Sequence, residues 1–515
     1  MKQAKPILLA TLALLVYQLG FFCPESLQQE SAIFILTSLV AGLGTAYLVV
    51  KQSNFSFLGL FVLIALTFFR SELFFYFDEW FVIERYRTHG DEIIWGLHNE
   101  HFIPGFKLVF LTQLKLFAEN YYPYLFFSYF IHLANSFLLY KIFKKLGAAN
   151  ELALLMVTVF ALSSLHAEVM SWAFEQSLLL SSFFMFSCLL FSIDYFETNN
   201  RTSLLGAFFA AAMPAFFFAN GFIVILLVGV IALKYFTEGT RFSQVGRLLA
   251  VVLAGLLVPL VSYYLVGAFG VSITGEEYPL LYRSVRSIKY IGYGIFLGTI
   301  ARGSGLYPGL EFGSARAIFS RLEEYATPEH PNFGNPAISS SNLSDPENWF
   351  LFLGIALVIV LSLYYLFKKE KQDKATLLFI LGGLWMVAVF LLPAWGRSMF
   401  GVGQSQYLRY QYLALPGFLI MLMPLLAGLI KRPKFFAVLA FVYFSAHFYH
   451  GAKFDYFSVR GAQSRDYLEV LEQDFKAAPA PVDAIVIDLY KEQLIASWEL
   501  LKTGLDPRAL QLSPK

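Results

Sequence analysis

Residues 56–80 read SFLGLFVLIALTFFRSELFFYFDEW, an apolar stretch that ends on two adjacent carboxylates, Asp78 and Glu79. Its apolar part, residues 56–76, is close to the roughly 20 residues that an α-helix needs to cross a bilayer. The stretch therefore predicts a membrane-spanning helix with two acidic side chains at its end. Where those carboxylates lie depends on whether the chain is a membrane protein or a soluble protein, and the composition answers that question.

The composition is that of a membrane protein. Of the 515 residues 57% are hydrophobic, only 14% are charged and 56 are Phe, whereas a soluble domain is about 25% charged. The net charge of +2 gives no information about partners, and no basic tract suggests a nucleic acid, so we expect no nucleic-acid partner. Cys23 and Cys188 both belong to apolar runs, so no disulfide framework is indicated. We expect an all-α polytopic membrane protein.

Thirteen apolar runs are candidate membrane spans. They fall at about 6–22, 31–50, 56–76, 121–143, 151–165, 174–194, 203–219, 221–236, 247–269, 346–368, 375–394, 410–430 and 433–450. The first resembles a signal peptide but lacks a small-x-small cleavage site, so we interpret it as a retained helix. Residues 105–118 are too short and too rich in lysine to span, and they fit a helix lying along the interface.

Lysine and arginine set the orientation. With the N-terminus in the cytoplasm, every predicted cytoplasmic connection carries Lys or Arg, as the positive-inside rule requires. The transmembrane domain then covers 1–450, and a small external appendix covers 451–515. The appendix sequence predicts a short strand followed by an amphipathic helix, an α/β-like tail. The predicted external loops are 77–120, 166–173, 270–345 and 395–409.

The external loops collect acidic and histidine side chains. Asp78 and Glu79 begin the first loop and are surrounded in sequence by aromatic residues. Aromatic neighbours would partly desolvate a carboxylate and raise its pKa toward that of a useful base. The alternative is that the pair simply ends a span. The same loop carries His98, Glu100 and His101.

A second external loop repeats this pattern with His166 and Glu168. A lone histidine at an interface is more often a surface group than a catalyst. His98, His101, His166 and Glu168 could together bind a divalent metal, but no fixed ligand spacing such as HExxH is present. A metal cofactor therefore stays an open alternative.

Arginines supply the opposite charge at the same predicted face. Arg397 and Arg409 flank a later external loop, and Arg409 begins a span. An arginine at a helix end can simply extend to the interface, whereas one facing a cavity matches phosphate oxygens with its planar fork. Acidic groups and arginines at one face suit a reaction with an anionic lipid-linked substrate.

Three motifs resemble the GT-C superfamily of membrane glycosyltransferases, and in particular the protein O-mannosyltransferases. An Asp-Glu pair is followed about twenty residues later by HFIPGFKL (101–108), similar to a His-Pro-Pro-Leu-Gly-Lys stretch of those enzymes. FALSSLHAEVMSWAFEQS (160–177) resembles the His-Pro-x-x-x-Glu-x-Val-x-Trp loop of the transmembrane-and-TPR O-mannosyltransferases. QYLRYQYLALPGFLI (406–420) resembles their Arg-Tyr-Leu-Tyr-Leu-Pro-Ser stretch. The chain differs in having two spans before the acidic loop, Ser-Leu-His in place of His-Pro, and no TPR repeats.

The resemblance implies a glycosyltransferase that moves a sugar from a polyprenyl-phosphate donor to an envelope glycan, lipid or protein. It also implies a bacterial cytoplasmic membrane, with the active site on the periplasmic face. Asp78 would be the base and Glu79 its support, and Arg397, Arg409 and Tyr410 would bind the donor phosphate. The acceptor cavity would contain His98, His101, His166 and Glu168. Two alternatives remain: a transporter or flippase for a lipid-linked saccharide, and a polysaccharide polymerase or ligase.

Overall fold

A computed structural model describes most of the chain. The described residues are 4–19, 21, 32–50, 57–99, 101–268, 284, 287–288, 290–292, 294–304, 374–398, 405, 407–453, 456–473 and 491–505. They are 87% helical and contain no β-strand. The predicted span 346–368 and the predicted strand of the appendix lie outside the described residues.

The first half of the chain supplies helices on both sides of the acidic loop. Its α-helices are α1 (Ala4–Leu19), α3 (Ala32–Val50), α4 (Phe57–Phe68), α5 (Asp78–His89), α6 (Pro104–Phe117), α7 (Tyr122–Lys145), α8 (Asn150–Ala161), α9 (Ala167–Ser171), α10 (Gln176–Thr198), α11 (Arg201–Ala212), α12 (Val224–Thr237) and α13 (Phe242–Leu265). Short 3-10 turns at Gly90–Trp95, Ser164–His166, Ala173–Glu175, Pro214–Phe216 and Ala219–Ile223 connect them.

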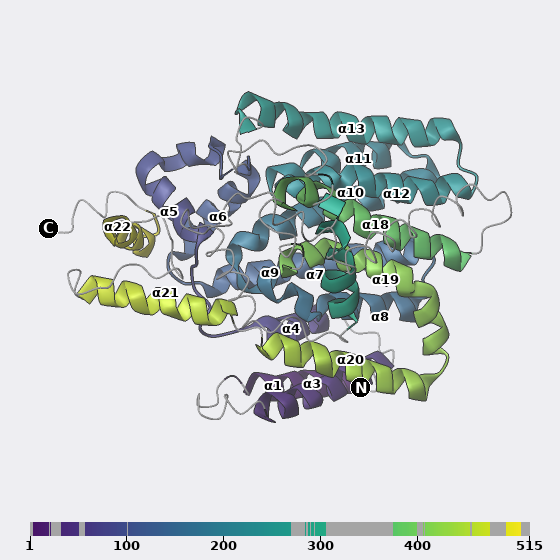
Figure 1. Ribbon diagram of the computed structural model, residues 1–515, viewed down its shortest axis with the longest axis horizontal. Helices are drawn as coiled ribbons and strands as arrows, with labels where there is room; N and C mark the ends of the chain where they lie inside the picture. Colours follow the sequence, from purple (N-terminus) through teal and green to yellow (C-terminus); the bar gives the residue numbers. More distant parts are fainter. Residues whose placement is uncertain are drawn as a thin grey trace.

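The second half completes the bundle and adds two peripheral helices. A π-helical segment, Gly294–Ala301, is followed by α18 (Lys374–Arg397), α19 (Leu408–Ile430), α20 (Pro433–Lys453), α21 (Tyr456–Gln473) and α22 (Lys491–Lys502). The predicted amphipathic helix of the appendix is α22. Figure 1 shows α21 and α22 beside α5 and α6, at one end of the long helices.

Within the described residues, six helices are long and apolar enough to cross a membrane, or seven if the bent pair α8 and α9 is one span. The all-α membrane class is therefore supported, but not the count of thirteen. The span predicted at 56–76 is shorter than expected, because α4 ends at Phe68 and the chain from 69 to 77 is not helical. At the C-terminal end of α4 the side chains of Gln18 and Arg70 donate to the carbonyl groups of residues 66, 67 and 69, which the end of the helix leaves without an intrahelical partner.

Small residues let the helices approach closely, as is common between membrane helices. A Cβ added at Gly42 of α3 would lie 2.0 Å from the Ser445 hydroxyl of α20. A Cβ added at Gly382 of α18 would lie 2.4 Å from the carbonyl oxygen of Gly417 in α19. These contacts fix the long helices against one another and provide a firm base for the loops at their ends.

Candidate functional site

The first predicted site residue, Asp78, begins α5 and faces a histidine. Its Oδ1 lies 3.1 Å from Nε2 of His98, with the two side chains 14% and 5% exposed. Two backbone hydrogen bonds of 2.8 Å pair His98 with His101 and hold the imidazole in place. The N-terminal end of a helix also favours a negative charge. Asp78 is thus an oriented carboxylate that remains within reach of a ligand.

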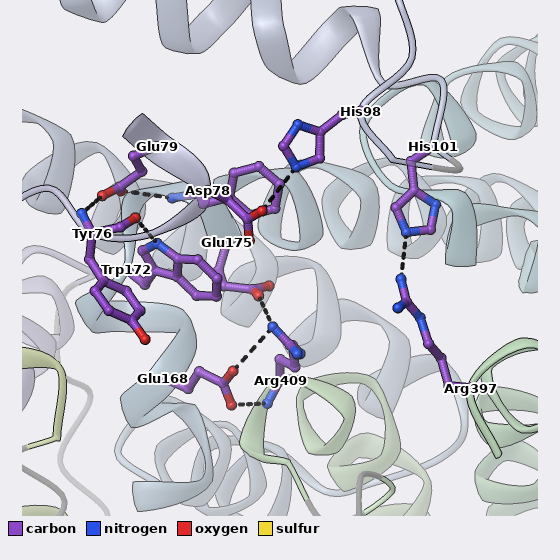
Figure 2. A network of polar contacts seen from close by, with 11 residues as sticks. Tyr76, Asp78, Glu79, His98, His101, Glu168, Trp172, Glu175, Arg397 and Arg409 are labelled. Carbon is purple, nitrogen blue, oxygen red and sulfur yellow. Dashed lines mark hydrogen bonds and ion pairs between the residues drawn. The ribbon is translucent and has the colours of Figure 1, made fainter. Parts of the chain in front are cut away.

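The neighbouring Glu79 points the other way, into the protein, as Figure 2 shows. Its carboxylate is fully buried and accepts three hydrogen bonds: from the Tyr76 amide (2.6 Å), the Tyr121 hydroxyl (2.8 Å) and the Phe174 amide (3.1 Å). Burial nevertheless raises the pKa of Glu79 to about 8, because desolvation outweighs these bonds. Glu79 therefore joins two predicted external loops instead of facing the same space as Asp78.

The turn before Asp78 adopts an uncommon backbone conformation. Phe77 has φ 45°, a region that a bulky residue rarely occupies and that costs about 1–3 kcal/mol. The bond from the Tyr76 amide to Glu79 spans this residue and stabilises it. The buried carboxylate thereby sets the direction in which Asp78 emerges.

A second group of charges forms around Arg409. Its Nη1 lies 3.3 Å from Oε1 of Glu175 and 3.5 Å from Oε1 of Glu168, and its amide donates to Oε2 of Glu168 (3.0 Å). The other oxygen of Glu175 is buried without a hydrogen-bond partner among the described residues. One guanidinium faces two carboxylates, so when both are ionised this trio carries a net negative charge. Figure 2 places it below Asp78.

A bend in the chain brings Glu168 to Arg409. The axis turns by 46° between α8 and the segment 164–171. At the bend, the hydroxyl of Ser163 accepts from the Leu165 amide at 3.3 Å and caps the short turn that follows. Without the bend, residues 164–171 would continue along the axis of α8.

Arg397 forms a separate contact on the other side of the group (Figure 2). It is the last residue of α18, and its Nη2 lies 3.1 Å from Nε2 of His101. Because a guanidinium can only donate, this geometry needs a neutral imidazole that accepts at Nε2. The side chain of Arg397 is therefore directed to the same loop that carries His98.

Of the other predicted site residues, His166 lies apart from these groups, whereas Tyr410 packs beside Arg409. His166 is fully buried, with its ring centroid 4.6 Å from that of Phe160, 4.7 Å from Tyr412 and 5.1 Å from His132. It faces the interior of the helix bundle, away from Glu168. Tyr410 is also buried, and its ring lies 5.7 Å from the Arg409 guanidinium.

The structure adds residues that the sequence prediction did not assign to the site. Glu175 completes the charge group, and Trp172 donates from Nε1 to the Tyr76 carbonyl at 3.3 Å. The signal for Glu175 was its spacing of seven residues from Glu168, which suggests a shared helical face. The Tyr121 hydroxyl, which donates to Glu79, had no such signal, because the two are 42 residues apart.

The geometry gives no support for a shared metal site. Within the described part of the chain, no three His, Cys, Asp or Glu side chains are grouped to hold a metal ion. Glu100 lies outside the described residues.

Comparisons of the chain with protein-family models, with curated proteins and with solved structures find no match.

Proposed function

We propose that the protein is a membrane glycosyltransferase that takes a sugar from a polyprenyl-phosphate donor and transfers it to a hydroxyl acceptor. The observation that carries this proposal is the Asp78–His98 pair, 3.1 Å apart, at the end of a bundle of membrane-length helices. A partly exposed carboxylate oriented by a histidine is suited to accept a proton.

Asp78 is the proposed general base. The acceptor oxygen attacks the anomeric carbon of the sugar and forms the new glycosidic bond, while the bond from that carbon to the phosphate oxygen breaks. The electron pair of the broken bond stays on the polyprenyl phosphate, and the acceptor proton passes to Asp78. His98 holds the carboxylate in position for this transfer.

Arg397 is the proposed ligand of the donor phosphate. Its Nη2 donates to Nε2 of His101 at 3.1 Å, which directs the guanidinium toward the loop that carries Asp78 and His98. Arg409 already faces the carboxyl groups of Glu168 and Glu175, which offset its positive charge. We therefore assign Arg409 to positioning the loops and Arg397 to binding the phosphate.

The experiment compares Asp78→Asn with Asp91→Asn, a matched change at an exposed position of the same loop. Membranes containing each protein receive a panel of polyprenyl phosphates, each carrying one radiolabelled hexose or pentose. We expect the wild type and Asp91→Asn to release sugar from one donor, and Asp78→Asn to lose at least a hundredfold in rate. Full activity of Asp78→Asn, or release from no donor by the wild type, would contradict the proposal.

A transporter is the second candidate, and one observation favours it. His132 lies near the middle of the membrane-length helix α7, where a titratable residue suggests a transport path. Its Nδ1 contacts the Tyr412 hydroxyl at 2.8 Å and its Nε2 contacts the Ala161 carbonyl at 3.1 Å. Both ring nitrogens are thus used in helix packing, which makes transport the weaker proposal. A polymerase or ligase would keep the transfer chemistry and change only the acceptor.

A further inference from the structure

The two histidines of the first loop lie at the two ends of one tight turn. His98 and His101 exchange two backbone hydrogen bonds of 2.8 Å, and Asn99 between them has φ 51°, a conformation that asparagine tolerates. The imidazole of His101 contacts Arg397 at 3.1 Å, and the imidazole of His98 contacts Asp78 at 3.1 Å (Figure 2). Any displacement of the turn would therefore move the imidazole that orients the proposed base.

A buried lysine anchors the chain just before this turn. Lys107, in the first turn of α6, is 1% exposed, and its Nζ donates to the carbonyls of Ile93 (2.9 Å) and Gly96 (2.8 Å). Arg85 of α5 donates to the next carbonyl along the chain, that of Leu97, at 2.9 Å. Cationic side chains from two helices therefore hold the backbone that leads into the turn.

The charge of Lys107 is placed where it is costly. Within the described residues, the hydrogen-bond partners of its Nζ are the two carbonyls, and no carboxylate forms an ion pair with it. Burial, and to a smaller extent the nearby charge of Arg85, lowers the pKa of Lys107 to about 8. An apolar side chain of similar length would fill the same space without this desolvation cost. What the lysine adds over such a side chain is its pair of hydrogen bonds to the loop backbone.

Aromatic packing connects α6 with the ring of His98 as well. Phe106, the residue before Lys107, contacts Phe174 with 4.9 Å between ring centroids, and Phe174 lies 5.0 Å from the His98 ring. The rings restrain the imidazole, while the hydrogen bonds of Lys107 restrain the backbone that carries it. Removal of the ammonium group should therefore loosen the turn and leave the packing of α6 in place.

We propose that Lys107 is a positioning residue, whose two hydrogen bonds hold the turn so that His98 orients the carboxylate of Asp78. It acts on the proposed base through His98. The proposal rests on the proposed transferase function, because it gives the turn a role in sugar transfer. The order that Lys107 imposes on the loop backbone is measurable without any activity.

The first measurement is amide hydrogen exchange of the purified full-length protein in detergent, followed by mass spectrometry. It compares Lys107→Met with Lys115→Met, a matched control on the same helix whose side chain contacts Asp91 of the same loop at 3.0 Å but is exposed. We expect Lys107→Met to speed exchange in peptides covering residues 93–98 by about tenfold or more, because the loop loses charge-assisted hydrogen bonds. Lys115→Met should leave that exchange unchanged, and wild-type protection in Lys107→Met would overturn the proposal.

Lys107→Gln covers the risk that Lys107→Met fails to fold, since its amide keeps a polar group in the buried position. Exchange of the same peptides should lie between that of the wild type and that of Lys107→Met. Global unfolding of both Lys107 variants would overturn the proposal, because the residue would then be needed for the fold as a whole.

The second measurement is the rate of sugar release from the donor that the wild type uses. We expect Lys107→Met to lower kcat about tenfold to a hundredfold and to leave the KM for the donor within about twofold, since a small displacement of a catalytic group has an effect of this size. In a His98→Ala background the same change should have little further effect, because Lys107 acts through His98. An undiminished loss in that background would overturn the proposal. If the wild type releases no sugar, the transferase proposal fails, and the exchange result alone decides whether Lys107 holds the turn.

Discussion

The buried carboxyl of Glu79 predicts an unusual dependence of stability on pH. Its pKa is about 8 in the folded protein, against an ordinary value of 4.5. Between these two values the folded state keeps the proton and the unfolded state has lost it, so folding takes up a proton. The free energy of unfolding must then fall as pH rises, by about 1.4 kcal/mol per pH unit and about 5 kcal/mol in total.

Glu79→Gln tests this reasoning, because an amide resembles the protonated carboxyl and cannot ionise. The three donors that now point at the carboxylate include backbone amides on both sides, so the amide nitrogen of Gln will face at least one donor. The lost bond costs about 1–3 kcal/mol at every pH. The variant should therefore be less stable than the wild type at pH 5 and more stable at pH 8, with a crossing near pH 6.

The assay is thermal unfolding in detergent between pH 5 and 8.5, followed by tryptophan fluorescence. Glu92→Gln, at an exposed position of the same loop, is the control and should keep the wild-type pH dependence. If the difference between wild type and Glu79→Gln is constant with pH, or grows in favour of the wild type as pH rises, the reasoning is refuted. Glu79 would then be ionised in the folded protein, with its three hydrogen bonds outweighing burial.

Two further predictions concern packing around the candidate site. Arg409→Met leaves Glu168 and Glu175 without a counter-ion. Since the side chain of Arg409 is 27% exposed, we expect the free energy of unfolding to fall by about 3 kcal/mol, the low end of the range for breaking a buried ion pair. An unchanged melting temperature would contradict the ion-pair role. Gly461→Ala would place a Cβ 2.7 Å from the backbone nitrogen of Phe74, so we expect a loss of about 1–3 kcal/mol in the same unfolding assay. Gly→Ala at a helical glycine with no atom close to the added Cβ should lower the free energy of unfolding less than Gly461→Ala does. Equal losses in the two variants would contradict the close contact between Gly461 and Phe74.

The sequence predicted the helical class and the loop positions better than the lengths of the spans. Most long runs, such as 121–143 and 410–430, became helices with nearly the predicted bounds. The run 56–76 did not, because hydropathy cannot distinguish a helix from an extended apolar segment that packs into the protein. Residues 73–75 are such a segment, buried against other aromatic rings.

The sequence identified most charged residues of the candidate site, but it identified only some of the side chains that contact them. Asp78 and His98 are 20 residues apart in one loop, so their meeting could be anticipated. Glu168 and Arg409 meet across 241 residues, a contact that depends on the bend before α9. His166, adjacent to that bend, turned into the bundle, because a one-residue difference in helical position changes the direction of a side chain by about 100°.

The C-terminal helices give the loop around Asp78 a rigid support. Trp80, two residues after Asp78, is fully buried and donates from Nε1 to the Ser464 hydroxyl of α21 at 3.2 Å. Ser497 of α22 donates to Glu84 of α5 at 2.7 Å. With Glu79 bonded on the bundle side, α5 is held from two directions. The proposed base must keep its position to within a fraction of an ångström. These contacts therefore link the appendix, whose described residues add no charge to the site, to the orientation of Asp78.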